Sequence, residues 1–242
     1  MTRFSSMRSS HWIGLFLMWA LLVLGTPGTA NAELFQRYKA EDQKEFAQSA
    51  AYADFVNAHN QDLVNTAFAS IPSEDRAQYG CGSSIRASSK HENVSIAADV
   101  QTIQGALNWG AWSAVVPISG CRNASSMVVL FFFTSNGPGA TFVGFGKSHA
   151  DGVNLTEINQ VFGLQVIRAL DEAKIDRSEC QSALRVLGIQ VVEATETRYG
   201  VKATEEWLIA ACARQWTAIV EIEGEPDGKQ GLGVRPMKLV EG

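Results

Sequence analysis

Serine, histidine and aspartate, the residue types of a hydrolytic triad, stand close together in the segment Ser148-His149-Ala150-Asp151. A triad needs its nucleophile, base and orienting carboxylate in one line of hydrogen bonds. Neighbours in sequence cannot form that line, so the segment is more simply interpreted as a polar turn. A catalytic site at Ser148 and His149 is kept as a second hypothesis.

Cys81 is the other candidate nucleophile. It lies in residues 78–83 (Gln-Tyr-Gly-Cys-Gly-Ser), which resemble the nucleophile segment of papain-like cysteine proteases. The resemblance ends directly afterwards, because Ser84 and Ile85 stand where those proteases have a cysteine and an aromatic residue. His149 follows Cys81 by only 68 residues, which is shorter than the spacing in that family. A disulfide cysteine in a glycine turn is the simpler interpretation.

Two further polar segments invite functional interpretations. Residues 144–148 (Gly-Phe-Gly-Lys-Ser) resemble the end of a phosphate-binding loop, but Thr141 stands where that loop has its first glycine. Glu205 and Glu206 precede Trp207 in strand-like sequence, where neighbouring side chains point to opposite faces. We therefore expect neither a nucleotide site nor a joint acid-base pair.

The histidines form no metal-binding pattern. His59, His91 and His149 follow the leader, and no two of them have the spacing of a zinc-ligand pair. The cysteines form no C-x-x-C pair either. The sequence predicts no metal and no cofactor.

Four tryptophans allow two interpretations. They could line a ligand-binding groove, but anchoring of the core beside disulfides is the more common role of such residues. We expect Trp112 and Trp207 to be mostly buried, because each begins a strand that leads to a cysteine. The four candidates are Trp109, Trp112, Trp207 and Trp216.

The first 32 residues are typical of a secretory signal peptide. Arg3 and Arg8 precede an apolar run over residues 12–25, and residues 30–32 (Ala-Asn-Ala) offer a small-residue cleavage site. The apolar run is shorter than the roughly 20 residues that span a membrane, and no later segment is long and apolar enough. Cleavage after Ala32 predicts a periplasmic or secreted protein with no membrane span after processing.

Processing leaves 210 of the 242 residues and removes two arginines, so the formal charge changes from −5 to −7. A chain of this length can bury the core of one large domain or two small ones. The acidic balance argues against binding to nucleic acid and to anionic lipid, since both are held mainly by cationic side chains.

An even number of cysteines in an exported chain favours two disulfides, for which three pairings are possible. The cysteines are Cys81, Cys121, Cys180 and Cys212.

Apolar periodicity predicts two similar series of elements. Each series contains a helix, a cysteine, a long strand, a strand with tryptophan at its start and cysteine near its end, and two further strands. The second helix, capped by Asn154 or Thr156, is apolar enough that we expect other parts of the chain on both of its flanks. Strand 127–133 is apolar on both faces and should lie in the middle of a sheet. The predicted helices cover residues 34–70, which a break near residues 57–60 would divide into two helices, and residues 154–170. The predicted strands cover 94–100, 112–118, 127–133, 141–147, 185–197, 207–213, 216–223 and 231–239.

The two series suggest an internal duplication. We predict an α+β fold of two similar lobes, each with one helix on an antiparallel sheet of about four strands. The domains would be the signal peptide at 1–32, a first lobe at 33–150 and a second lobe at 151–242. Bridging equivalent positions within each lobe would pair Cys81 with Cys121 and Cys180 with Cys212.

Several motifs resemble a group of uncharacterised exported proteins of proteobacteria. The resemblance covers roughly residues 105–130 and 180–231, and it departs from the group at Arg122 and at Ala213-Arg214, where glycine-arginine pairs would be expected. It implies export and disulfides, and no activity. The motifs are Trp-Gly-x-Trp at 109–112, Gly-Cys-Arg at 120–122, Glu-Glu-Trp at 205–207, Ala-Cys-x-Arg at 211–214 and Pro-Asp-Gly at 226–228.

These observations favour a non-enzymatic periplasmic binding or interaction protein, with an unknown protein or small molecule of the cell envelope as its partner. The alternative is a small secreted hydrolase with a site at Cys81 or at Ser148 and His149. A third interpretation is a structural member of an envelope complex.

Overall fold

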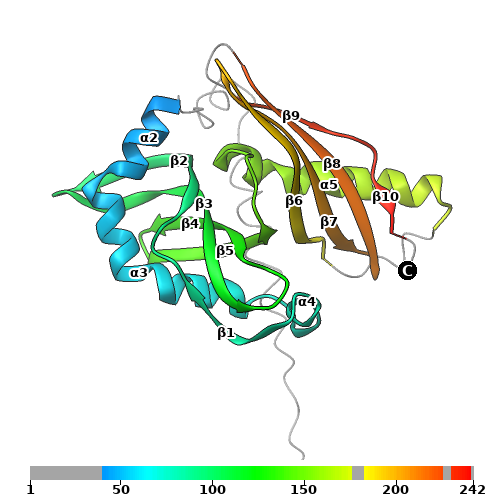
Figure 1. Cartoon of the computed structure of the whole chain (residues 1–242), viewed down its shortest axis with the longest axis horizontal. Coiled ribbons are helices and arrows are strands. Elements are labelled where there is room, and N and C mark those ends of the chain that lie inside the picture. The colour runs from blue at the N-terminus through cyan, green and yellow to red at the C-terminus, as the bar shows by residue number, and fades with distance from the viewer. Residues whose placement is uncertain (1–39, 176–182, 226–229, 241–242) are drawn as a thin grey trace, which may run out of the picture. The chain divides into compact units, whose positions relative to one another are not determined.

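Strands dominate the computed structural model, which describes residues 40–175, 183–225 and 230–240 (Figure 1). Within these residues, ten strands form one mixed sheet in the order β1-β3-β4-β5-β6-β7-β8-β10, with β2 also paired to β3 and β9 to β8. The helices are α2 (Ala40–Gln48), α3 (Ala50–Ala69), α4 (Ser73–Gln78) and α5 (Gly152–Glu172), and the strands are β1 (Cys81–Ala87), β2 (Glu92–Ile103), β3 (Ala106–Cys121), β4 (Ser126–Thr134), β5 (Gly137–Gly146), β6 (Arg185–Thr197), β7 (Gly200–Ala211), β8 (Arg214–Gly224), β9 (Gln230–Val234) and β10 (Lys238–Leu239).

Helix α3 covers the first part of the sheet. Its N-cap is Ser49, whose hydroxyl accepts a hydrogen bond from the Tyr52 backbone N–H at 3.1 Å. One side of the helix is apolar, and Phe55, Val64 and Phe68 from that side are buried in the same cluster as side chains of β3 and β4. This packing buries the first of two apolar clusters.

Strand β4 is covered on both faces, which confirms the prediction made from its apolar sequence. Val129 and Phe131 belong to the cluster under α3, whereas Val128 belongs to the cluster under α5. Alternate residues of a strand point to opposite faces, so one strand contributes to both clusters.

A short parallel pairing joins β5 to β6, at Phe145 with Gly188 and at Gly146 with Ile189. Parallel neighbours need a crossover connection, and α5 supplies it. Gly146 has φ +107°, and a Cβ there would lie 1.9 Å from the Ile189 carbonyl oxygen. Only glycine fits this junction.

The predicted architecture of two similar lobes, each with a separate four-stranded antiparallel sheet, is wrong. The parallel pair makes one mixed sheet of all ten described strands, and three of the four described helices precede β1. Helix α5 packs in a cluster with β7 and β8, and it also contacts β2 and β3. Periodicity in the sequence identifies strands, but the pairing of β5 with β6 depends on neighbours that periodicity does not encode.

One predicted disulfide is confirmed. Cys81 and Cys121 lie opposite each other on β1 and β3, and their sulfur atoms are bonded. Cys212 is buried and disulfide-bonded, while Cys180, the partner predicted for it, lies outside the described residues.

The predicted signal peptide, residues 1–32, also lies outside the described residues. Among the helices that are described, none is long and apolar enough to cross a membrane.

The burial predicted for Trp112 and Trp207 is confirmed, since both are 0% exposed. The Trp112 indole N–H has no hydrogen-bond partner among the described residues, so this side chain stabilises the fold through packing. Trp112→Ala should therefore lower the free energy of unfolding by about 3–5 kcal/mol. Denaturant unfolding measures this change.

Trp109→Ala is the matched control, because Trp109 lies on the same strand and is 42% exposed. It should change the free energy of unfolding by less than about 1 kcal/mol. Equal losses from the two substitutions would contradict the packing role of Trp112.

Candidate functional site

The most deeply buried charged side chain of the described residues is Glu205 on β7, which is 0% exposed. Thr204 and Glu206, its neighbours on the strand, point to the opposite face, and Glu206 is exposed. The prediction that Glu205 and Glu206 point to opposite faces is confirmed. Burial of a carboxylate is costly unless donors surround it.

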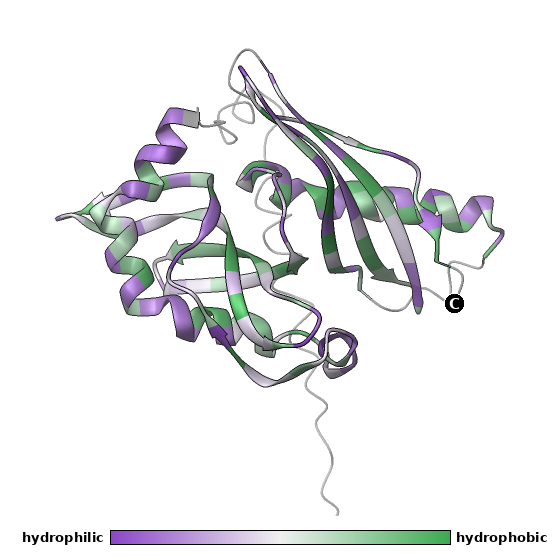
Figure 2. Cartoon of the chain, in the orientation of Figure 1, coloured by the Kyte–Doolittle hydropathy of each residue, from purple (hydrophilic) through white to green (hydrophobic). Residues whose placement is uncertain are grey.

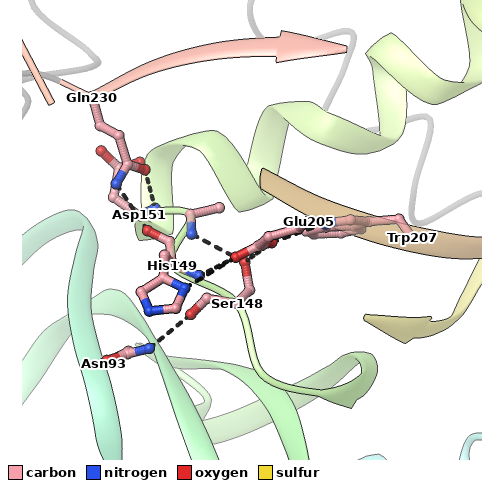
Figure 3. Close-up of polar contacts among 8 residues, drawn as sticks. Asn93, Ser148, His149, Asp151, Glu205, Trp207 and Gln230 are labelled. Atoms are coloured by element: carbon pink, nitrogen blue, oxygen red, sulfur yellow. Dashed lines mark hydrogen bonds and ion pairs between the residues drawn. The ribbon is translucent and has the colours of Figure 1, made fainter. Parts of the chain in front are cut away.

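Three hydrogen-bond donors and the His149 imidazole surround the Glu205 carboxylate (Figure 3). One oxygen accepts from the Ser148 hydroxyl and from the Trp207 indole N–H, each at 2.9 Å. The other accepts from the His149 backbone N–H at 2.6 Å and lies 3.3 Å from His149 Nδ1. Trp207 reaches the carboxylate because residues two apart on a strand share a face.

The segment after β5 is held to three strands through these contacts. Ser148 and His149 bind Glu205 on β7, and the Asn93 side chain on β2 donates to the Ser148 carbonyl at 2.9 Å. From β9, Gln230 donates to the His149 carbonyl at 2.8 Å and accepts from the Asp151 N–H at 2.7 Å. The segment is thus fixed between β5 and α5, where the crossover begins.

Asp151 begins the helix that follows. Its carboxylate accepts from the Asn154 backbone N–H at 2.8 Å and caps α5. The prediction of Asn154 or Thr156 as the cap is wrong by three to five residues. The Asn154 side chain is buried and donates to Gln230 instead.

The geometry differs from that of a hydrolytic triad. The Ser148 hydroxyl donates to Glu205, accepts from the Ala150 N–H at 3.0 Å, and belongs to a residue that is 2% exposed. His149 lies beside the same carboxylate, so serine and histidine are two donors on one acceptor. A triad requires the serine to donate to the histidine.

The imidazole of His149 is 23% exposed at its side chain and connects the buried carboxylate to the surface. The contacts with Glu205 can hold the His149 imidazole in one orientation. It presents no exposed nucleophile beside that imidazole within the described residues.

The other predicted site residues lie apart. Cys81 is bonded to Cys121 and has no thiol. In the segment that resembles a phosphate loop, Gly146 serves the β5–β6 junction and Lys147 forms an exposed ion pair with Glu92 at 2.6 Å. No cluster of three or more metal-ligating side chains occurs in the part of the chain that the structure describes.

The four tryptophans do not share one cavity. Trp112 belongs to the apolar cluster under α3, and Trp207 and Trp216 belong to the cluster under α5. Trp109 lies near the start of β3 and is exposed.

A second polar group, which sequence reasoning missed, lies in the aromatic part of the first cluster. His91 Nδ1 lies 2.7 Å from the Tyr52 hydroxyl, and its Nε2 lies 2.9 Å from the Asn60 amide oxygen. The His91 ring stacks on Phe131. Because the Asn60 oxygen can only accept, Nε2 carries the proton and the neutral imidazole accepts from Tyr52.

Burial changes the acidity of both partners. It lowers the pKa of His91 to about 4 and raises the pKa of Tyr52. The pair remains neutral near pH 7 and is part of the core.

Comparison with family models, curated proteins and solved structures finds no match to this chain.

The His91 environment predicts a loss of stability in acid. The pKa of His91 in the folded protein, about 4, is below its ordinary value of 6.5, so the unfolded chain takes up the proton first as pH falls. The stabilisation is complete above pH 6.5 and decreases down to pH 4, by on the order of 3 kcal/mol. Unfolding free energies measured across this range should show a smaller slope for His91→Gln, and an unchanged slope would contradict the assignment.

The hydrogen bonds around Glu205 predict that even a conservative substitution there lowers the free energy of unfolding. Glu205→Gln replaces one accepting oxygen with an NH₂ group that faces donors, so at least one buried donor loses its partner. We expect a loss of about 2–4 kcal/mol in the free energy of unfolding. Glu206→Gln, the exposed neighbour, should change it by less than about 0.5 kcal/mol. Similar values for the two variants would show that the carboxylate does not organise this region.

Proposed function

We propose that the protein is exported, stabilised by disulfides, and acts by binding a protein partner in the cell envelope without catalysing a covalent reaction. The observation that carries this proposal is an apolar surface on α5. The proposal is also supported by the bonds that occupy the candidate nucleophiles and by the small size of two surface recesses.

The expectation that other parts of the chain pack on both flanks of α5 is wrong for the flank that carries Leu164 and Ile167. Leu164 is 63% exposed and Ile167 is 41% exposed, whereas Ile158, Phe162 and Val166 are buried against the sheet. Figure 2 shows hydrophobic and hydrophilic residues alternating along α5. Residues three apart are neighbours on a helix surface, so Leu164 and Ile167 form one apolar patch, here called the α5 patch.

An exposed apolar patch on a surface helix is typical of an interaction site. Single exposed leucines are common, but two large side chains on adjacent turns expose apolar area that a partner can cover. Burial of such side chains is favourable by about 25 cal/mol per Å² of apolar surface.

The candidate nucleophiles support binding over catalysis. The Cys81 sulfur is held in a disulfide, and a thiolate is required for attack. The Ser148 hydroxyl is buried and donates to Glu205. A hydrolase at either position would need a large rearrangement before it could contact a substrate.

Two recesses in the described part of the surface favour a protein over a small molecule as the partner. Two recesses have volumes of about 290 and 320 Å³, at the lower limit for small-molecule sites. One is lined in part by Ser88, Pro117 and Ile118. The other contains the Asp75–Arg185 ion pair, whose charges already satisfy each other at 2.8 Å.

Site-specific photo-crosslinking in the producing cells tests the proposal. A photoreactive residue at Leu164 should give a discrete crosslinked product, because a bound partner covers the α5 patch. The same residue at Asn159, which is exposed on a different side of α5, is the matched control and should give none. N-terminal sequencing of the same material should begin at Glu33.

Two results would contradict the proposal. Equal crosslinking at positions 164 and 159 would show that the α5 patch has no specific partner. A mature chain that retains residues 12–25 would contradict export by a cleaved signal peptide.

A further inference from the structure

Among the described strands, β6 has an unpaired edge along more than half of its length. It pairs with β5 only at Gly188 and Ile189, and residues 190–197 pair only with β7 among the described strands. All of residues 190–197 except Val191 are exposed, and Val192 is 59% exposed. Figure 1 shows the β6–β7 hairpin extending away from β5 beyond this junction. The unpaired side of residues 190–197 is here called the β6 edge.

An edge of this kind presents backbone donors and acceptors to another strand. Four of its eight residues are Val191, Val192, Thr195 and Thr197, which are β-branched and favour extended backbone. The neighbouring unpaired edge of β5 differs, because it contains Pro138 and Gly139, which pair poorly with an added strand. The β6 edge is therefore the better site for strand addition.

Carboxylates flank the β6 edge. Glu193 pairs in register with Thr204, on the face that also carries the exposed Glu206, and Glu196 pairs with Val201 on the face turned toward α5. Neither Glu193 nor Glu196 forms an ion pair within the described residues. Lys202 on the adjacent strand is already paired with Glu223 at 3.3 Å.

We infer that the β6 edge binds an extended, cationic segment of a partner protein by strand addition. This inference rests on the proposed binding function and names the chemistry of one partner. Glu193 and Glu196 are three residues apart and point to opposite faces, so the partner should carry lysine or arginine at positions three apart. A second copy of this chain is disfavoured, since its β6 edge would bring the same carboxylates and like charges across strands repel.

The probe is a synthetic peptide of about eight threonine and valine residues, with lysines at two positions three apart, long enough to cover the edge. Binding to the purified, disulfide-bonded protein is followed by fluorescence anisotropy. Glu193→Lys combined with Glu196→Lys should weaken binding by about tenfold, because two attractive cross-strand pairs become repulsive. Glu172→Lys, an exposed carboxylate on α5, is the matched control and should leave the affinity unchanged.

Backbone pairing is tested separately from charge. A peptide with the same sequence, N-methylated at alternate residues, retains its charge but loses donors along one edge, and one of the two methylation patterns should abolish binding. Equal binding of both methylated peptides would overturn strand addition. The inference would also be overturned if the unmodified peptide did not bind. It would likewise be overturned if the protein self-associated and Glu193→Lys with Glu196→Lys removed that self-association.

The inference and the proposed function fail in different ways. Leu164→Glu changes the α5 patch and should leave peptide affinity unchanged. Peptide binding without a crosslink at position 164 would contradict the role of the α5 patch alone. A crosslink at position 164 without peptide binding would contradict the β6 edge alone.

Discussion

The buried carboxylate of Glu205, whose two oxygens both accept hydrogen bonds, fixes the segment between β5 and α5. Glu205 lies inside the sheet-helix layer, where an uncompensated charge would cost several kcal/mol. Ser148, His149 and Trp207 supply the compensation, and two of these residues belong to the segment that leaves β5. The same contacts that make the charge tolerable therefore set the start of α5. The parallel pairing of β5 with β6 depends on that start, since α5 is the crossover between them.

The two apolar clusters meet across β4, which contributes side chains to both of them. Val128 and Val129 are adjacent in sequence and belong to different clusters. A change in the volume of β4 would be felt under both α3 and α5, because interiors are closely packed. Strand β4 therefore connects the two apolar clusters, just as the sheet connects the strands of both.

Sequence reasoning succeeded where the physical cause is local. Alternation placed Glu205 and Glu206 on opposite faces, apolar composition placed β4 in the centre, and strand position explained the burial of Trp112 and Trp207. The Cys81–Cys121 pairing was also correct, although the two-lobe scheme behind it was wrong.

The features that sequence reasoning missed depend on contacts between residues far apart in the sequence. Ser148 and Glu205 are 57 residues apart, and nothing in either segment alone indicates that one carboxylate gathers the donors of both. The exposure of Leu164 was missed for a related reason, because an apolar helix flank shows that a partner is favourable but not whether the same chain provides it.

The junction at Gly146 has a kinetic consequence. Most of the sheet consists of antiparallel neighbours joined by short connections, which close quickly, whereas Phe145 and Gly188 are separated by 43 residues and must wait for the crossover helix. We expect the two antiparallel parts to form first and the junction to close late. Until it closes, the pairing groups of Gly188 and Ile189 remain open, and they lengthen the edge that residues 190–197 present. A side chain at position 146 would block the carbonyl of Ile189 and would prolong that open state. Glycine at this position therefore limits how long a nascent chain offers a wide strand edge to its neighbours.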